Sequence, residues 1–485
     1  MKLSNILCNV THEILQGTPD CEISNLVIDS RQVSSGTLFF CIKGLHADGH
    51  DYIGKAAELG ASAVVVDRDL SKYPAGITVI KVANTRKAMS LIAANFYGNP
   101  ADGMKLVGIT GTNGKTSSVY LIEAILDEWR KKDGIITTVD CRVCGTPVDV
   151  DFATSTTPDS IELQHILRAM NDAGAEYVAM EVTSHALALD KVEGMHFRVA
   201  GFTNLTQDHL DFHKDFDDYR DTKKRLYSQC GHAVTNIDDP YGAYMVEGHP
   251  CTVTTYSIDN PSDLRATNVQ LLARGVEFDV SINGEVVHFS LPVRGRFTVY
   301  NALNAIGICL ALGTPANVIA QALSKVQGVP GRIQSVPSRH DFDVIVDYSH
   351  TPDSLENILA AVRETTRGKV IVIFGCGGDR DKGKRPIMGE IAAVNADYVI
   401  VTSDNPRKED PMSITVEIEA GVTRHNTPYE LTVDRREAIK NGIRMAQPGD
   451  TVVIAGKGHE NYQIFADCTV HFDDYEEATN VLESL

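Results

Sequence analysis

The sequence lacks the features that mark several large classes of protein. No apolar stretch reaches about 18 residues, so no ordinary transmembrane helix is expected. The N-terminal segment MKLSNILCNVTHEILQG interrupts its apolar run with Asn and Thr, which predicts that it is not a secretion signal. No run of five Lys or Arg occurs, and 45 Lys plus Arg stand against 64 Asp plus Glu, a formal net charge of −19. We therefore expect no nucleic-acid partner and no insertion into a membrane.

Cysteine is also sparse. Ten Cys in 485 residues are too few for a disulfide framework and fit a reducing compartment. Cys141 and Cys144 have CxxC spacing, but without a second pair or a nearby His this spacing is only a weak sign of a metal or redox site. With 43% hydrophobic and 22% charged residues, the composition is that of an ordinary folded protein. These observations predict a soluble, cytoplasmic chain of several domains.

Two segments rich in Gly and Pro divide the chain, YGNPADGM (97–104) and GVPGRIQ (328–334). Between and after them, apolar β-rich runs alternate with stretches of helical periodicity, which is typical of parallel sheets covered by helices. The pattern predicts helices over Thr85–Tyr97 and Thr116–Lys131, and strands over Tyr177–Val182 and Val199–Leu205. We predict an α/β protein of three domains: a smaller N-terminal α/β domain (1–102), a central P-loop mononucleotide-binding parallel sheet (103–332) and a C-terminal Rossmann-like doubly wound domain (333–485).

The segment GITGTNGKT (108–116) follows a predicted strand and opens a predicted helix, which is the context of a phosphate-binding loop. Glycines let backbone N–H groups face an anion, the helix N-terminus adds partial positive charge, and Lys115 can reach the outer phosphates. Thr116 would place its hydroxyl on Mg²⁺. The strict pattern G-x-x-x-x-G-K-[ST] fails by one residue, because its first Gly would stand at Ile109. The alternative is a Gly-rich turn with a surface Lys; the segment favours ATP or GTP.

Acidic and imidazole side chains follow two further predicted strands. Glu181 ends one strand, and His209, Asp211 and His213 follow the next. Because the carboxyl ends of parallel strands meet at one edge of a sheet, these groups are candidate ligands for a hard cation. Taken singly, Asp211 and His213 could equally be loop-surface residues. Lys223, in a predicted helix, reads by itself as a solvated lysine.

Eight segments occur along the chain in this order: GTNGKTS (111–117), STTPDS (155–160), EVTSHAL (181–187), TNLTQDHLDFH (203–213), YRDTK (219–223), GRFTVYNALNA (295–305), DYSHTPDSL (347–355) and AGKGHE (455–460). Taken together they resemble the Mur ligase family, whose members extend a peptidoglycan precursor by ATP-driven amide bonds. The resemblance runs from about residue 26 to residue 460 in the family's order, and within the family it is greatest to the members that add the third peptide residue.

The resemblance implies a nucleotide and metal site. It implies two Mg²⁺ ions held by Thr116, Glu181, His209 and a carbamate that CO₂ forms on Lys223. It implies catalytic roles for Lys115, His209 and Lys223. The ATP contacts that it implies are Gly111, Thr112, Asn113, Gly114, Lys115, Thr116, Ser117, Asn301, Arg332, Asp347 and His350.

The resemblance also implies the two other substrates. One is UDP-N-acetylmuramoyl-L-alanyl-D-glutamate, whose contacts would be Ser30, Thr156, Thr157, Thr183 and Lys191. The other is meso-diaminopimelate, because in this family the sequence DNPR marks members that add it, whereas lysine-adding members lack the Arg. Its contacts would be Arg380, Asp404, Asn405, Pro406, Arg407, Gly456 and Glu460. By composition alone, DNPR is only a turn.

The sequence departs from the family at three positions. Thr183 and Lys191 stand where the family usually has Ser and Arg, and Gln334 replaces a Glu. Thr keeps the hydroxyl, but Lys cannot reproduce the planar fork of Arg. Four functions remain open: the diaminopimelate-adding ligase, the lysine-adding ligase, a folate polyglutamate synthase, and a P-loop switch or binding module without amide chemistry. We expect the protein to act as a monomer.

Overall fold

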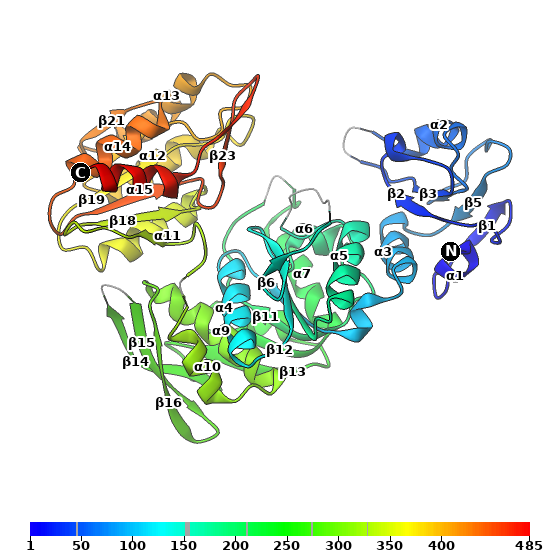
Figure 1. The fold of residues 1–485 in the computed structure, drawn as a ribbon, viewed down its shortest axis with the longest axis horizontal. Coiled ribbons are helices and arrows are strands. Elements are labelled where there is room, and N and C mark those ends of the chain that lie inside the picture. The colour runs from blue at the N-terminus through cyan, green and yellow to red at the C-terminus, as the bar shows by residue number, and fades with distance from the viewer. Residues whose placement is uncertain (45–46, 151–155, 210–211, 273–274, 327) are drawn as a thin grey trace. The chain divides into compact units, whose positions relative to one another are not determined.

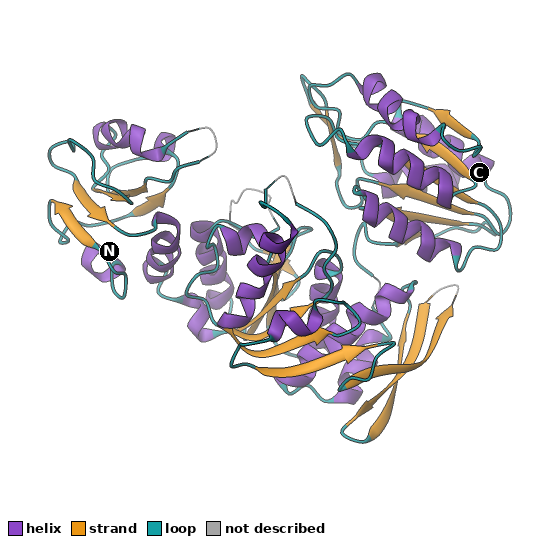
Figure 2. Cartoon of the chain, turned by 180° about the vertical axis from the view of Figure 1, so that it is seen from behind, coloured by secondary structure: helices purple, strands orange, loops and turns teal. Residues whose placement is uncertain are grey.

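A computed structural model describes residues 1–44, 47–150, 156–209, 212–272, 275–326 and 328–485. Contacts group the chain into two compact units. One unit consists of Met1–Lys115, Leu126–Thr255 and Gly307–Thr314, and the other of Thr116–Ile125, Tyr256–Ile306 and Pro315–Leu485. Strands covered by helices make up most of both units, as Figures 1 and 2 show. In the described part of the chain, no helix is long and apolar enough to cross a membrane.

The N-terminal region folds around a five-stranded sheet of order β1-β5-β4-β3-β2. Helix α3 begins after Asn84, whose side chain accepts hydrogen bonds from the N–H groups of Arg86 and Lys87 and so caps the helix. The elements are α1 (Leu3–Ile6), β1 (Glu13–Gln16), β2 (Asn25–Val27), η1 (Ser30–Gln32), β3 (Thr37–Phe40), η2 (Gly49–Tyr52), α2 (Ile53–Glu58), β4 (Ala63–Val66), β5 (Thr78–Lys81), α3 (Thr85–Phe96) and η3 (Pro100–Gly103).

The central sheet has eleven strands in the order β16-β15-β14-β13-β12-β11-β6-β10-β7-β8-β9. Strand β6 runs parallel to β10 on one side and to β11 on the other, so the carboxyl ends of these three strands lie side by side. The elements are β6 (Lys105–Thr110), α4 (Lys115–Glu128), β7 (Asp133–Ile136), β8 (Cys141–Val143), β9 (Thr146–Pro147), α5 (Ser160–Asp172), β10 (Tyr177–Glu181), α6 (Ser184–Ala188), β11 (Phe197–Phe202), α7 (Phe216–Lys224), η4 (Arg225–Gln229), β12 (Cys230–Asn236), α8 (Gly242–Val246), β13 (Thr252–Ser257), β14 (Leu264–Leu272), β15 (Gly275–Ile282), β16 (Glu285–Leu291), α9 (Arg296–Leu312) and α10 (Ala316–Leu323).

The C-terminal sheet has six strands in the order β17-β18-β22-β19-β20-β21. Every residue of β19 and β22 is buried, as expected for central strands of a parallel sheet covered on both faces. Apolar side chains of α11, α12 and α13 pack on one face, and those of α14 and α15 on the other. The elements are β17 (Gln334–Val336), β18 (Asp343–Asp347), α11 (Pro352–Arg363), β19 (Val370–Phe374), α12 (Lys384–Asn395), β20 (Tyr398–Val401), α13 (Pro411–Val422), β21 (Tyr429–Leu431), α14 (Arg435–Met445), β22 (Thr451–Ala455), β23 (Tyr462–Ile464), β24 (Thr469–His471) and α15 (Asp474–Ser484).

The predicted elements are present with small shifts at their ends. The helix predicted over Thr116–Lys131 spans Lys115–Glu128, and the strand predicted over Val199–Leu205 spans Phe197–Phe202. The antiparallel strands β14, β15 and β16 were not predicted from the sequence. Their signal was the Asn283–Gly284 pair, because both residues have positive φ in the turn between β15 and β16 and Asn-Gly favours such hairpin turns.

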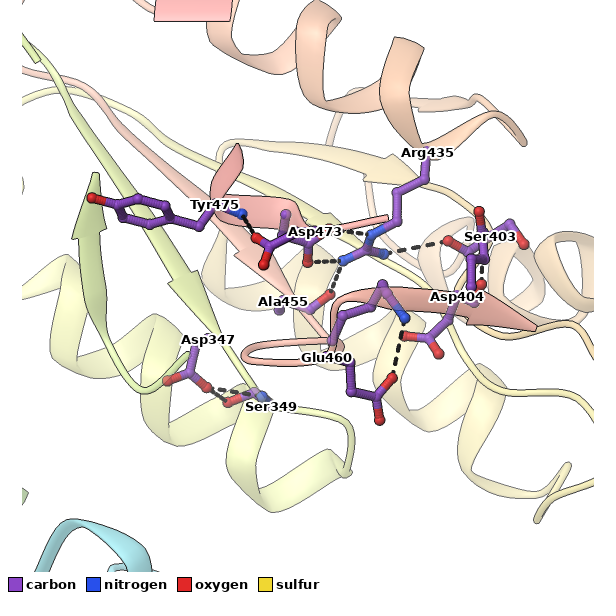
Figure 3. Close-up of polar contacts among 12 residues, drawn as sticks. Asp347, Ser349, Ser403, Asp404, Arg435, Ala455, Glu460, Asp473 and Tyr475 are labelled. Carbon is purple, nitrogen blue, oxygen red and sulfur yellow. Dashed lines mark hydrogen bonds and ion pairs between the residues drawn. The ribbon is translucent and has the colours of Figure 1, made fainter. Parts of the chain in front are cut away.

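A buried ion pair joins the two helices on one face of the C-terminal sheet. Arg435, the first residue of α14, and Asp474, the first residue of α15, are both fully buried and 2.6 Å apart. The same guanidinium donates to the backbone carbonyls of Ser403 and Ala455, as Figure 3 shows. All of its charge is therefore compensated inside the protein rather than by water.

We predict that Asp474→Asn lowers the free energy of unfolding by about 3–5 kcal/mol, because it leaves a buried guanidinium without its counter-charge. Glu477→Gln is the matched control. Glu477 lies in the first turn of α15, as Asp474 does, but its charge pairs with the exposed Arg436 of α14. Its expected cost is at most about 1 kcal/mol. Thermal unfolding followed by circular dichroism measures both. Equal shifts in the two variants would contradict the assignment of Arg435–Asp474 as the stabilising pair.

Candidate active site

The predicted phosphate loop connects β6 to α4 at the middle of the central sheet. Gly111 has a φ of 146°, and a Cβ there would lie 1.9 Å from Oγ1 of Thr203. Asn113 is held by the residues that follow β11: its N–H donates to Oδ1 of Asn204 at 3.0 Å, and its carbonyl accepts from Oγ1 of Thr203 at 2.7 Å. The loop is therefore fixed from a neighbouring strand, and only a glycine fits its closest approach.

Two lysines donate to the same carbonyl of this loop. Nζ of Lys115 lies 3.1 Å from the Gly111 oxygen and 2.7 Å from the Thr112 oxygen, and Nζ of Lys223 lies 2.8 Å from the Gly111 oxygen. Lys223 is 2% exposed and stands over the ring of Tyr219. Burial, reinforced by the charge of Lys115, holds the pKa of Lys223 well below its ordinary value. The reading of Lys223 as a solvated helix lysine is therefore wrong.

Glu181 lies at the carboxyl end of β10, where it was predicted, and is almost fully buried. Its Oε1 accepts from the N–H of Thr138 at 2.9 Å and from the Thr138 hydroxyl at 3.3 Å. The hydroxyl of Thr157 donates to the Glu181 carbonyl at 2.9 Å, and Thr156 accepts from Thr138 at 3.0 Å. The structure thus brings Thr156 and Thr157 to the Glu181 edge of the sheet.

His209 follows β11 with a positive φ of 55°, and its side chain is 42% exposed. Its ring lies 4.8 Å from the ring of His185 and 6.1 Å from that of Tyr219. His213 is buried instead, with Nδ1 3.0 Å from a carboxylate oxygen of Asp218. Asp211 lies outside the described residues.

No three His, Cys, Asp or Glu side chains gather in a metal-binding arrangement within the described ranges. Thr116 and Ser117 lie in the first turn of α4, and the Thr116 side chain is buried. Cys141 is buried in β8, Cys144 is exposed, and both are free thiols.

Three of the predicted dipeptide contacts lie together in the central region. Thr157 and Thr183 share a hydrogen bond of 3.2 Å between their hydroxyls, and Nζ of Lys191 donates to the Thr157 carbonyl at 3.1 Å. Burial lowers the pKa of Lys191. Ser30 belongs to the N-terminal region, where it is the buried first residue of η1.

A second group of predicted nucleotide contacts surrounds Asp347 at the end of β18. Its buried carboxylate accepts from the N–H of Ile333 at 2.8 Å and from both the N–H and the hydroxyl of Ser349 (Figure 3). Burial raises the pKa of Asp347, and Arg332 opposes that shift. The Arg332 guanidinium stands 4.6 Å from the centre of the Tyr348 ring, against which His350 also packs. Asn301 is buried in α9.

The DNPR turn follows β20 and contacts the segment after β22. Nδ2 of Asn405 donates to Oε2 of Glu460 at 2.8 Å. Nζ of the fully buried Lys457 lies 3.1 Å from the same Glu460 oxygen and 3.4 Å from Oδ1 of Asn405. Gly456 adjoins this cluster closely, because a Cβ there would lie 2.8 Å from a carboxylate oxygen of Asp404. Figure 3 shows Asp404 and Glu460 on neighbouring loops.

Arg407 and Arg380 come from adjacent loops. Arg407 has a φ of 52°, and its Nη1 donates to the carbonyl of Gly378 at 2.9 Å and toward that of Asn405 at 3.5 Å. Among the residues that the structure describes, no other donor of the Arg407 side chain has a partner. Arg380 is exposed. DNPR is therefore more than a surface turn, because Asp404, Asn405 and Pro406 are buried.

Several residues of this site were not singled out from the sequence. Lys457 lies inside the quoted AGKGHE segment, and Thr203 and Asn204 inside the quoted TNLTQDHLDFH segment, so their neighbourhood could have indicated them. Tyr219 is likewise the first residue of the quoted YRDTK segment, whereas Thr138 gave no such signal. The contacts of both residues depend on which loops the sheet brings together.

Three family models match the chain. The Mur ligase middle domain matches residues 109–309, the Mur ligase glutamate ligase domain matches 331–458, and the model described as Mur ligase family, catalytic domain, matches 22–97.

Curated relatives match over essentially their whole length, among them the following two. A protein of Clostridium tetani is 44% identical, with 100% of each chain covered, and one of Caldanaerobacter subterraneus is 44% identical, with 99% of each covered. Both carry the name UDP-N-acetylmuramoyl-L-alanyl-D-glutamate–2,6-diaminopimelate ligase.

Solved structures agree with the fold. A structure of a UDP-N-acetylmuramoyl-L-alanyl-D-glutamate–2,6-diaminopimelate ligase matches with a TM-score of 0.72 and 29% identity, covering 100% of this chain and 99% of that one. A folylpolyglutamate synthase of Mycobacterium tuberculosis matches with a TM-score of 0.63 and 16% identity, over 77% of this chain and 93% of that one, which shows a common fold and no more. These likenesses confirm the predicted α/β fold class. The phosphate loop, the buried Lys223 beside it and the full-length matches together show that the chain belongs to the Mur ligase family.

Proposed function

We propose that this protein is an ATP-dependent amide ligase that adds meso-2,6-diaminopimelate to UDP-N-acetylmuramoyl-L-alanyl-D-glutamate, releasing ADP and phosphate. One observation carries the choice of amino acid. The backbone carbonyl of Asn405 accepts from the cation Arg407, and its side-chain amide donates to the anion Glu460. Asn405 therefore lies between a cation and an anion. A zwitterionic amino-acid end, with one ammonium and one carboxylate, is complementary to that pair. The names of the relatives support the same substrates.

The chemistry divides into two steps. The terminal phosphoryl group of ATP is transferred to the D-glutamyl carboxylate, and the bond between that phosphorus and the ADP oxygen breaks. The uncharged amine of diaminopimelate then attacks the acyl carbon, phosphate leaves with the bonding electron pair, and the amine loses a proton. In the first step, Lys115 and the N–H groups at the start of α4 stabilise the charge on the phosphoryl oxygens.

The donor set at the edge of the central sheet fits Mg²⁺. Thr116 and Glu181 offer a hydroxyl and a carboxylate, the hard oxygen ligands that Mg²⁺ prefers, and both side chains are buried. We assign these two residues and His209 as ligands of up to two ions. Bound Mg²⁺ would screen the repulsion between the anionic carboxylate and the anionic triphosphate.

We further assign a carbamate to Lys223. The residue is buried beside the phosphate loop, and an uncharged amine is the form that reacts with CO₂. The uncharged amine nitrogen would form a bond to the carbon of CO₂ and release one proton, which would convert a buried amine into an anionic oxygen ligand. A cytoplasmic location and a monomeric state remain predictions, as do the three domain boundaries.

We predict that phosphate release requires all three substrates. The assay follows phosphate with ATP, the UDP-muramoyl dipeptide and one amino acid at a time. Omission of the sugar nucleotide should reduce the rate to background, because it carries the carboxylate that is activated. Equal ATP hydrolysis without it would favour a switch or binding module, and turnover with a folate would favour a polyglutamate synthase.

We predict that Lys223→Ala loses most of the activity and regains part of it when a short-chain carboxylate is added, because the carboxylate can occupy the position of the lost carbamate. Lys224→Ala is the matched control: this neighbouring lysine stands over the Tyr244 ring and outside the proposed site. Turnover of Lys223→Ala near that of the wild type would show that no carbamate is needed.

We predict a preference for diaminopimelate over lysine of at least about a hundredfold in kcat/KM. The two differ in one carboxylate, and leaving a charged hydrogen-bonding group unpaired costs on the order of 2–5 kcal/mol. Arg407→Ala should lose most of the diaminopimelate activity and gain little with lysine, since the substitution removes the contact to the second carboxylate and adds no group that binds lysine. Lys408→Ala, the exposed neighbour, is the control. Comparable wild-type rates with both amino acids would overturn the substrate assignment but leave the ligase assignment intact.

A further inference from the structure

Two loops that carry the predicted arginine contacts leave neighbouring parallel strands. The loop after β19 holds Arg380, and the loop after β20 holds Arg407. Their backbones are in direct contact, because a Cβ on Gly378 would lie 1.9 Å from the carbonyl oxygen of Pro406. Asp379 and Arg407 both have a φ of 52°, a left-handed conformation that non-glycine residues rarely adopt. Such backbone persists only where the surroundings hold it in place.

Glu409 joins the two loops. Its Oε1 accepts from the N–H of Asp379 at 2.6 Å, and its Oε2 lies 2.9 Å from Nζ of Lys382. Both residues belong to the Arg380 loop, whereas Glu409 lies two residues after Arg407. Hydrogen bonds from Arg385, Lys382 and the Asp379 N–H lower the pKa of Glu409 to about 2. Glu409 is therefore charged at neutral pH.

Arg385 fixes the carboxylate in place. This guanidinium is fully buried and donates to both Glu409 oxygens, at 3.0 and 3.1 Å. It also donates to the Gly377 carbonyl at 3.2 Å and to Oε2 of Glu417, on α13, at 2.8 Å. The two carboxylates thus pair with the same cation, but only Glu409 has contacts with the Arg380 loop among the described residues. Glu417 alone could balance the charge of Arg385. Charge balance therefore does not explain why a second carboxylate, Glu409, stands two residues after the DNPR turn.

We propose that Glu409, anchored on Arg385, is a positioning residue for the amino-acid substrate. It holds the Arg380 loop against the DNPR turn and so keeps Arg380 and Arg407 at a fixed spacing for one substrate carboxylate. Glu409 acts through these two arginines and does not touch the substrate. The inference rests on the proposed function, because that function makes the arginines substrate contacts.

Glu409→Gln and Glu417→Gln form a matched pair for the test. Each removes one negative charge from Arg385 with little change in shape, so both should lower Tm to a similar extent. Only Glu409→Gln should raise the KM for diaminopimelate, by about tenfold, the effect typical of losing one charged hydrogen-bonding partner. Its KM values for ATP and the UDP-muramoyl dipeptide should stay within about twofold of the wild type, as should all three values for Glu417→Gln.

Hydrogen exchange of the full chain without substrates gives a second readout. Peptides covering 376–382 should exchange faster in Glu409→Gln and at the wild-type rate in Glu417→Gln. Should Glu409→Gln not fold, Glu409→Asp serves in its place, since it keeps the charge beside Arg385 but shortens the reach to the Asp379 N–H. An unchanged KM for diaminopimelate, or equal rises in KM for the Glu409 and Glu417 variants, overturns the proposal.

The same experiment separates this inference from the function on which it rests. The wild-type enzyme is assayed with diaminopimelate alongside the variants. Failure of the wild type to use it overturns the substrate assignment, and hydrogen exchange still tests whether Glu409 holds the loop. Normal wild-type turnover with identical exchange and KM in both variants overturns only the positioning role.

Discussion

A charge removed from water must be compensated by nearby protein groups, and this constraint shapes every part of the proposed site. Four basic side chains, Lys223, Arg385, Arg435 and Lys457, are almost completely buried. Each has at least one partner on a loop that follows a strand: a carbonyl of the phosphate loop for Lys223, Glu409 for Arg385, the Ser403 carbonyl for Arg435 and Glu460 for Lys457. Because leaving any of them unpaired is costly, the loops are held in one arrangement. The hydrogen bonds of these buried basic side chains thus fix loops in place, although loops are usually the mobile part of a fold.

Parallel strand order decides which loops meet. Strand β6 lies between β10 and β11, so the phosphate loop, Glu181 and the Thr203–Asn204 pair emerge at one edge of the central sheet. Strands β19 and β20 are neighbours in the C-terminal sheet, which brings the Arg380 loop beside the DNPR turn. Glycines at 111 and 378 allow contact distances that any side chain would prevent. In both sheets, strand order therefore decides which functional side chains lie at the same edge. Glycine allows the backbone of one loop to approach the neighbouring loop closely.

Much of the architecture could be predicted because its signals are local. The apolar runs of β6, β10 and β22 and the helices that follow Asn84 and Gly114 are set by burial patterns and end signals within a few residues. The hairpin extension β14–β16 was missed, although Asn283–Gly284 marked one of its turns. The burial of Lys223 and of the DNPR turn, in contrast, could not be predicted from local sequence. Their own segments favour a solvated lysine and a surface turn, and burial of both depends on residues more than fifty positions away.

By itself, the sequence determined which chemical groups are present and roughly where the strands and helices begin, since those depend on neighbours along the chain. It also determined the family, because eight segments in one order resemble it. Only the tertiary structure decided that Lys115 and Lys223 share one carbonyl, that Lys457 supports Asn405 and Glu460, and that Glu409 ties two loops together on Arg385. These are contacts between segments far apart in the chain. Their hydrogen bonds and desolvation costs exist only once the sheets have brought the loops together, so no local pattern could encode them.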